Sequence, residues 1–128
     1  MTVSNLAKYR ILVVEDETLI AVMIEDALLE MDCEVVGPTG RLDKALELAK
    51  DPQVDAAILD VTIRGGKVYP VAHQLIELGI PFVFSSGYGD WALPEALRDK
   101  PRLMKPFTIS ALGKQISLLC GEAAKRRG

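Results

Sequence analysis

Four apolar segments of the sequence are each followed by polar residues of types that serve in metal binding and group transfer. In chain order, they are Glu15 and Asp16 after Ile11–Val14, Asp60 after Ala56–Leu59, Ser86 after the run that begins at Phe82, and Lys105 after Leu103–Met104. Carboxylates held close together repel one another, and a hard divalent cation such as Mg²⁺ removes that conflict because it prefers oxygen ligands. Beside such a cation a carboxylate can attack a phosphoryl group, and a lysine ammonium can pair with the phosphoryl oxygens. These residue types therefore indicate Mg²⁺-assisted formation of an aspartyl phosphate.

Each of these residues also has an ordinary structural explanation. Asp16 could cap the N-terminus of a helix, and Asp60 could be a loop carboxylate. Ser86 could belong to a Ser-Gly-Tyr-Gly turn, and Lys105 could be a solvated lysine. A site is indicated only because all of them are expected at the same edge of one sheet.

Short apolar runs typical of strands alternate with stretches of helical periodicity along the whole chain. Five βα repeats of this kind predict a parallel sheet with helices on both of its faces. The continuous runs at 11–14, 56–59 and 82–84 suit central strands, and the shorter runs at 35–36 and 103–104 suit the edges. The predicted fold is therefore an α/β, doubly wound, flavodoxin-like sheet of order 2-1-3-4-5 with five helices. In such a sheet ligands bind at the carboxyl ends of the strands, where the polar residues named above lie.

The helical stretches are expected to differ in regularity. The first has an apolar stripe that includes Met23 and Met31, and the fourth, over 90–98, is short and interrupted by Pro94. Thr108 is expected to cap the last helix, and the basic residues at 125–127 are expected to be frayed, solvent-facing chain.

Composition restricts the classes of protein to which the chain can belong. It has 128 residues, of which 49% are hydrophobic, and a formal charge of −3 from 15 basic and 18 acidic residues. This predicts one domain with a real core and argues against a broad cationic face for nucleic acid. No apolar run approaches the ~18–20 residues that cross a bilayer. Cys33 and Cys120 have no metal-ligand spacing, which fits a reduced, cytoplasmic compartment with both thiols packed as small hydrophobic groups.

On these residues the chain resembles the receiver domain of two-component response regulators, which is a CheY-like fold. The resemblance covers residues 9–124, with an N-terminal tail at 1–8 and a C-terminal tail at 125–128. The matching stretches are Ile11–Asp16, Ile58–Thr62, Pro81–Tyr88 and Lys105–Phe107.

The resemblance implies a role for each residue of the predicted site. Asp60 would be the phosphoacceptor, Ser86 the switch hydroxyl, and Lys105 the lysine that contacts the phosphoryl group. Mg²⁺ would be bound by Asp16 and Asp60, by Glu15 through water, and by the backbone carbonyl of Thr62.

Three features depart from the family pattern. The acidic pair is Glu-Asp rather than Asp-Asp, and Arg102 stands where receivers often have an aromatic switch residue. The segment after Asp60 reads Val-Thr-Ile-Arg-Gly-Gly, without the frequent Met-Pro. The run Phe-Ser-Ser-Gly-Tyr is similar to the Phe-Ala-Thr-Gly-Tyr signature of a subgroup of stand-alone receivers.

The resemblance thus implies a single-domain response regulator that catalyses only its own phosphorylation and dephosphorylation. A histidine kinase or phosphotransfer protein would supply the phosphoryl group. The downstream protein partner would dock on the face of the fourth helix and fifth strand, which includes Trp91, whereas His73 is expected on a helix surface. A cytoplasmic monomer or weak dimer is expected, with no nucleic-acid or membrane partner.

Two alternatives stay open. A degenerate receiver would act only as a binding module. A small phosphatase of the haloacid-dehalogenase kind would also use an aspartate nucleophile, but it needs a second carboxylate two residues later, where this chain has Thr62.

Overall fold

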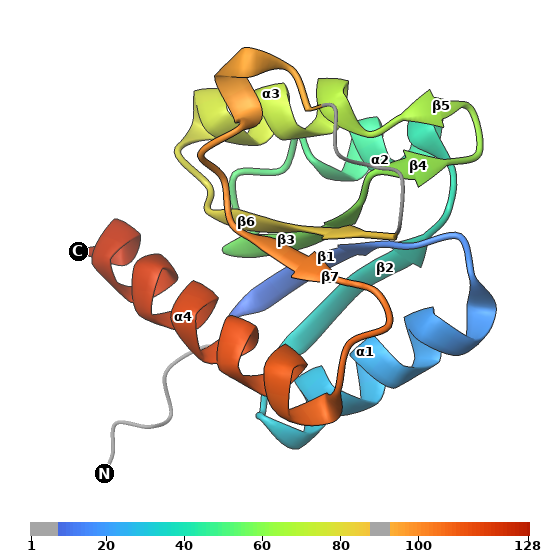
Figure 1. The fold of residues 1–128 in the computed structure, drawn as a ribbon. Coiled ribbons are helices and arrows are strands. Elements are labelled where there is room, and N and C mark those ends of the chain that lie inside the picture. Colours follow the sequence, from blue (N-terminus) through green and yellow to red (C-terminus); the bar gives the residue numbers. More distant parts are fainter. Residues whose placement is uncertain (1–7, 88–92) are drawn as a thin grey trace, which may run out of the picture.

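The computed structural model describes residues 8–87 and 93–128, and its centre is a five-stranded parallel sheet (Figure 1). Its strands lie in the order β2-β1-β3-β6-β7. Because β6 and β7 are the fourth and fifth parallel strands along the chain, this is the predicted order 2-1-3-4-5. A separate antiparallel pair, β4 and β5, follows β3. The bounds of the strands are β1 Arg10–Val14, β2 Glu34–Thr39, β3 Ala56–Asp60, β4 Thr62–Ile63, β5 Gly66–Lys67, β6 Phe82–Ser86 and β7 Arg102–Met104.

Helices cover both faces of the sheet, as the βα repeats predict (Figure 1). On one face lie α1 (Thr18–Glu30) and α4 (Ile109–Arg127), and on the other lie α2 (Leu42–Leu48) and α3 (Tyr69–Leu78). The described part of the predicted fourth helix contains only a short 3₁₀ turn, η2 (Glu95–Leu97), so four α-helices are described rather than five. Within the described ranges, no helix is both long and apolar enough to cross a membrane.

Strand alternation divides the core between the two faces. Leu12, Leu59 and Phe84 point toward α2 and α3, while Ile58 and Val83 point toward α1 and α4. All five side chains are fully buried. Burying each such side chain contributes about 1.5–3 kcal/mol, and this packing holds the strand ends in a fixed relation to one another.

The predicted apolar stripe of α1 is partly wrong. The helix buries Ala21, Ile24 and Leu28, whereas Met31 lies just past the last helical residue and is 39% exposed. Because the helix ends at Glu30, Met31 leaves the face that packs on the sheet. His73 is exposed on α3, as predicted, and Trp91 lies outside the described residues.

The prediction of frayed chain at 125–127 is also wrong, because α4 continues through Arg127. The Arg127 guanidinium lies 2.7 Å from the buried carboxylate of Asp55 and 4.4 Å from the ring centroid of Tyr9. Arg126 donates to the carbonyl oxygens of Leu78 and Pro52. A buried aspartate needs partners, and the end of the helix supplies one of them beside the Arg10 amide. At its other end α4 is capped as predicted, since the Thr108 hydroxyl accepts a hydrogen bond from the Ala111 amide at 3.0 Å.

Candidate functional site

The carboxyl ends of β1, β3, β6 and β7 bring the predicted residues to one edge of the sheet. β1 ends at Val14, so Glu15 and Asp16 leave the sheet next to Asp60, the last residue of β3. The amide of Glu15 donates to Thr39 at the end of β2, at 2.9 Å. The amide of Lys105 donates to the Ser86 carbonyl at 2.8 Å. Parallel pairing therefore fixes both ends of the site by backbone bonds.

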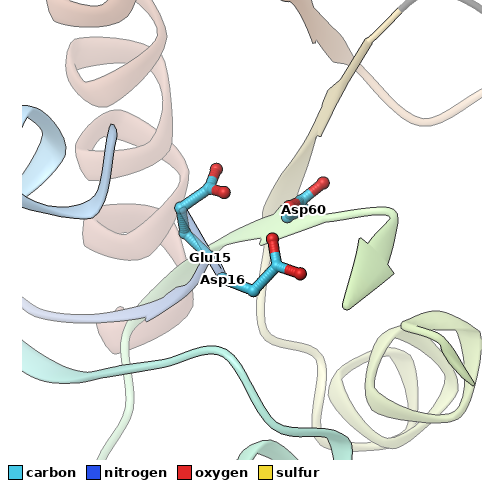
Figure 2. Close-up of side chains that lie close together, drawn as sticks. All are labelled: Glu15, Asp16 and Asp60. Carbon is cyan, nitrogen blue, oxygen red and sulfur yellow. The ribbon is translucent and has the colours of Figure 1, made fainter. Parts of the chain in front are cut away.

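Three carboxylates meet at this edge (Figure 2). Glu15, Asp16 and Asp60 each offer an oxygen atom, and these atoms lie within 4.8 Å of one another. Asp16 does not cap α1: the N-cap residue is Glu17, which has no side-chain cap bond, and the Glu17 amide donates to the Glu15 carboxylate at 3.0 Å. The structural alternative for Asp16 is therefore wrong, and its carboxylate stays with the cluster.

Lys105 adds one positive charge to the cluster. Its Nζ lies 2.9 Å from Oε1 of Glu15 and 3.3 Å from Oδ2 of Asp60. The side chains of Glu15, Asp60 and Lys105 are 0%, 7% and 15% exposed. Lys105 is thus no solvated lysine, and Asp60 is no ordinary loop carboxylate. When all three carboxylates are ionised, the single ammonium leaves two negative charges without a counterion.

Burial beside a second carboxylate raises the pKa of Asp60 to about 8. Burial is the largest cause, the neighbouring Glu15 carboxylate adds to it, and the Lys105 ammonium opposes both. For Lys105, burial alone would lower the pKa, but the bond to Glu15 and the charge of Asp60 outweigh it and raise the pKa. The site therefore favours a proton on Asp60 unless another cation compensates its charge.

The donor set fits a hard divalent cation. Carboxylate oxygens from three residues stand within reach of one ion, and two negative charges await compensation. Thr62, the predicted carbonyl ligand, begins β4 two residues after Asp60, and its hydroxyl accepts a bond from Nζ of Lys67 at 2.8 Å.

Ser86 lies at the same edge of the sheet, but its hydroxyl is bonded to Met104 rather than to a residue of the acidic cluster. It is 1% exposed and donates to the Met104 sulfur, with 3.9 Å between Oγ and Sδ. The residue paired with Asp60 in the sheet is Ser85, so Ser86 stands one position further out. Arg102, at the position of the aromatic switch residue, is half-buried on β7.

Sequence reasoning missed two residues beside the site. Ser85 is fully buried next to Asp60, and its hydroxyl has no hydrogen-bond partner within the part of the chain that the structure describes. Gly40 lies against Asp16, since a Cβ atom at Gly40 would stand 2.6 Å from Asp16 Cα. The Gly-Pro-Thr-Gly pattern at 37–40 indicates a turn but not this contact, because the contact joins the ends of two different strands.

The search with family models finds no match for this chain. Among solved structures, the chain is similar to SdrG from Sphingomonas melonis Fr1, with 45% identity and a TM-score of 0.77, covering 88% of this chain and 97% of SdrG. A BeF₃-activated conformation of SdrG is 44% identical over 89% of this chain and 99% of that chain, with a TM-score of 0.71.

The chain is also similar to two proteins with lower sequence identity. The transcriptional regulatory protein PdtaR of Mycobacterium tuberculosis is 34% identical over 113 residues, which is 85% of this chain and 55% of PdtaR. The chain thus spans about half the length of the curated relatives it matches. The receiver domain of sensor histidine kinase PA1611 from Pseudomonas aeruginosa PAO1, which holds a magnesium ion in its active site cleft, has the same fold. It is 21% identical over 90% of this chain and 99% of that chain, with a TM-score of 0.73.

Proposed function

The chain belongs to the receiver domains of response regulators, and from that premise we propose that it is a Mg²⁺-dependent switch phosphorylated on Asp60. The observation that carries the proposal is the cluster of three carboxylates beside a single ammonium, that of Lys105, which contacts Glu15 and Asp60 but not Asp16 among the contacts of the described residues. A permanent ion-pair network would balance its charges. The cluster has excess negative charge, so it can accept Mg²⁺ together with an anionic phosphoryl group.

We assign the cation's ligands from the residues that the edge presents. Asp16 and Asp60 would bind Mg²⁺ directly, Glu15 through water, and Thr62 through its backbone carbonyl. When bound, the cation lowers the negative charge of the site and orients the phosphoryl oxygens. The receiver domain of PA1611, which has the same fold and holds magnesium in its active site cleft, supports Mg²⁺ as the cation.

In the proposed reaction the Asp60 carboxylate attacks the phosphorus of a phosphohistidine or of an acyl phosphate. The new O–P bond forms as the bond to the donor breaks, and the imidazole or carboxylate leaves with the electron pair. Lys105 then exchanges its bond to Asp60 for one to a phosphoryl oxygen, while its contact with Glu15 keeps it in place.

We infer that the Ser86 hydroxyl responds to the phosphoryl group on Asp60. Its bond to the Met104 sulfur is weak and is readily exchanged for one to a phosphoryl oxygen. Such an exchange would pull the end of β6 toward Asp60 and bias the neighbouring surface, where a downstream protein would dock. SdrG, a relative at 44% identity, has a BeF₃-activated conformation, which supports the expectation that this chain also has an activated state. The donor would be a histidine kinase or phosphotransfer protein in the cytoplasm.

The proposal is tested by intact-mass measurement after incubation with acetyl phosphate and Mg²⁺. We expect the wild type to gain one phosphoryl group, and Asp60→Asn to gain none. Asp26→Asn, an equivalent change at an exposed position of α1, serves as the matched control and should react like wild type. A wild type that takes up no phosphate from acetyl phosphate or from a histidine kinase would refute the proposal and favour a binding module.

A further inference from the structure

The segment after Asp60 forms a hairpin that replaces the expected loop. β4 and β5 pair in antiparallel fashion, with Ile63 opposite Gly66, so Arg64 and Gly65 form the turn between them. Gly65 and Gly66 have φ values of +101° and +132°, which side chains with a Cβ rarely adopt. The two glycines therefore allow the tight turn that presents Arg64 at its tip.

Backbone contacts fix Arg64 relative to the acidic cluster. Its amide donates to the Gly40 carbonyl at 3.0 Å, and its carbonyl accepts from the Leu42 amide at 2.8 Å. Gly40 itself lies against Asp16, because only a residue without a Cβ fits there. The hairpin tip is thus tied to the segment that touches a predicted metal ligand.

The Arg64 side chain lines a cleft of about 240 Å³ together with Glu15, Asp16 and Thr18. It forms no ion pair or hydrogen bond with the described residues, although two carboxylates line the same cleft. Arg41, the bridge partner of Arg64, differs: its guanidinium is paired with Asp43, with 3.0 Å between Nη2 and Oδ2. One guanidinium beside the site is therefore already neutralised, while the other remains available.

We propose that Arg64 binds the anionic oxygens of the phosphodonor as it enters the cleft beside Asp16. This inference rests on the proposed function and deepens it. A guanidinium offers several N–H donors in one plane, which match phosphoryl oxygens. Because the cluster carries excess negative charge, the positive charge of Arg64 in this cleft reduces the repulsion that an incoming anion meets.

The proposal has a signature that a purely structural role lacks. The same positive charge attracts the anionic donor and repels Mg²⁺. Removing it should slow phosphorylation by acetyl phosphate about 2- to 5-fold and tighten Mg²⁺ binding by a similar factor, because water weakens the interaction of an exposed charge with both groups. Damage to the hairpin would instead weaken both, because Gly40 and Asp16 would move.

The experiment compares Arg64→Gln with Arg41→Gln, which removes the same charge from the neighbouring, already paired guanidinium. Mg²⁺ affinity is measured by calorimetry without donor, and the initial phosphorylation rate is measured by intact mass at saturating Mg²⁺. We expect opposite changes in Arg64→Gln, near wild-type values in Arg41→Gln, and a wild-type Mg²⁺ affinity in Arg64→Lys, which keeps the charge.

Two results would overturn the inference while leaving the proposed function intact. One is an Arg64→Gln protein that matches wild type in both measurements, and the other is a change of both in the same direction. A wild type that binds no Mg²⁺ and takes up no phosphate would overturn the proposed function and this inference together.

Discussion

The contact between Gly40 and Asp16 gives the sharpest structural prediction, since it can be tested with a single added methyl group. In Gly40→Ala the new Cβ would stand 2.6 Å from Asp16 Cα, 2.7 Å from Asp16 Cβ and 3.1 Å from the Glu15 carbonyl oxygen. These neighbours are backbone atoms or the first side-chain atom, so no rotamer change relieves the overlap. Overpacking of this kind costs about 1–3 kcal/mol.

We expect Gly40→Ala to weaken Mg²⁺ binding as well as to lower the stability of the fold. Relief of the overlap requires Asp16 to move, and disturbing a group that orients a metal ligand weakens metal binding by about 10- to 100-fold. The free energy of unfolding is measured by urea denaturation without Mg²⁺, and Mg²⁺ affinity by calorimetry. Both should fall in Gly40→Ala.

Gly113→Ala is the matched control for this prediction. Gly113 lies inside α4, and a Cβ there would have no neighbour within 4 Å. Alanine in a helix interior is favoured over glycine, so this variant should be more stable by about 0.5–1 kcal/mol with unchanged Mg²⁺ affinity. A Gly40→Ala protein as stable as wild type and equal to it in Mg²⁺ affinity would refute the inferred role of the contact.

Three further predictions concern buried polar groups. Arg127→Ala should lower the free energy of unfolding by about 1–2 kcal/mol in urea denaturation, because Asp55 loses its ion-pair partner at 2.7 Å and keeps only the Arg10 amide among the described residues; the value is discounted for the partly exposed guanidinium, and an unchanged free energy would contradict the prediction. Ser85→Ala should raise the free energy of unfolding by about 1 kcal/mol, because the change removes a buried hydroxyl that has no hydrogen-bond partner among the described residues. A lower free energy of unfolding would show that the hydroxyl is hydrogen-bonded. Without Mg²⁺, wild type should lose stability relative to Asp60→Asn between about pH 4 and pH 8. The raised pKa of Asp60 means that the folded state binds the proton more tightly than the unfolded state, and this stabilisation is lost as pH rises through 8. A pH-independent difference between the two proteins would contradict the assigned pKa.

The sheet and the edge that carries the site were predictable from the sequence, because both follow from local patterns. Apolar runs identify strands, and the residues that follow them must gather where parallel strands end. Asp60 illustrates this: its neighbours along the chain place it after a strand, and the strand order then places it beside Glu15 and Asp16.

The contacts that tune the site were not predictable in the same way, because they join segments far apart in the sequence. The Gly-Pro-Thr-Gly pattern at 37–40 indicates a turn, but the approach of Gly40 to Asp16 depends on the register of β1 and β2. Likewise, a basic C-terminal segment has the composition of frayed chain, and the contacts of Arg127 with Asp55 and Tyr9 join it to residues far away in the sequence.

The described part of the predicted fourth helix shows how local signals can compete. The stretch has helical residues, but Pro94 lacks an amide proton and disfavours helical backbone in the residue before it. Within the described residues of this stretch, the only helical structure after Pro94 is the 3₁₀ turn η2. The segment after Asp60 is similar, since its Gly65-Gly66 pair does not by itself predict the hairpin that β4 and β5 form.

The most direct test of the central claim is to locate the phosphoryl group by borohydride reduction and peptide mass spectrometry after treatment with acetyl phosphate. Reduction converts an aspartyl phosphate to homoserine and thereby marks the acceptor. The proposed mechanism predicts homoserine at position 60 only, dependent on Mg²⁺ and abolished by a chelator. Homoserine at another aspartate, or at position 60 in the presence of the chelator, would contradict it.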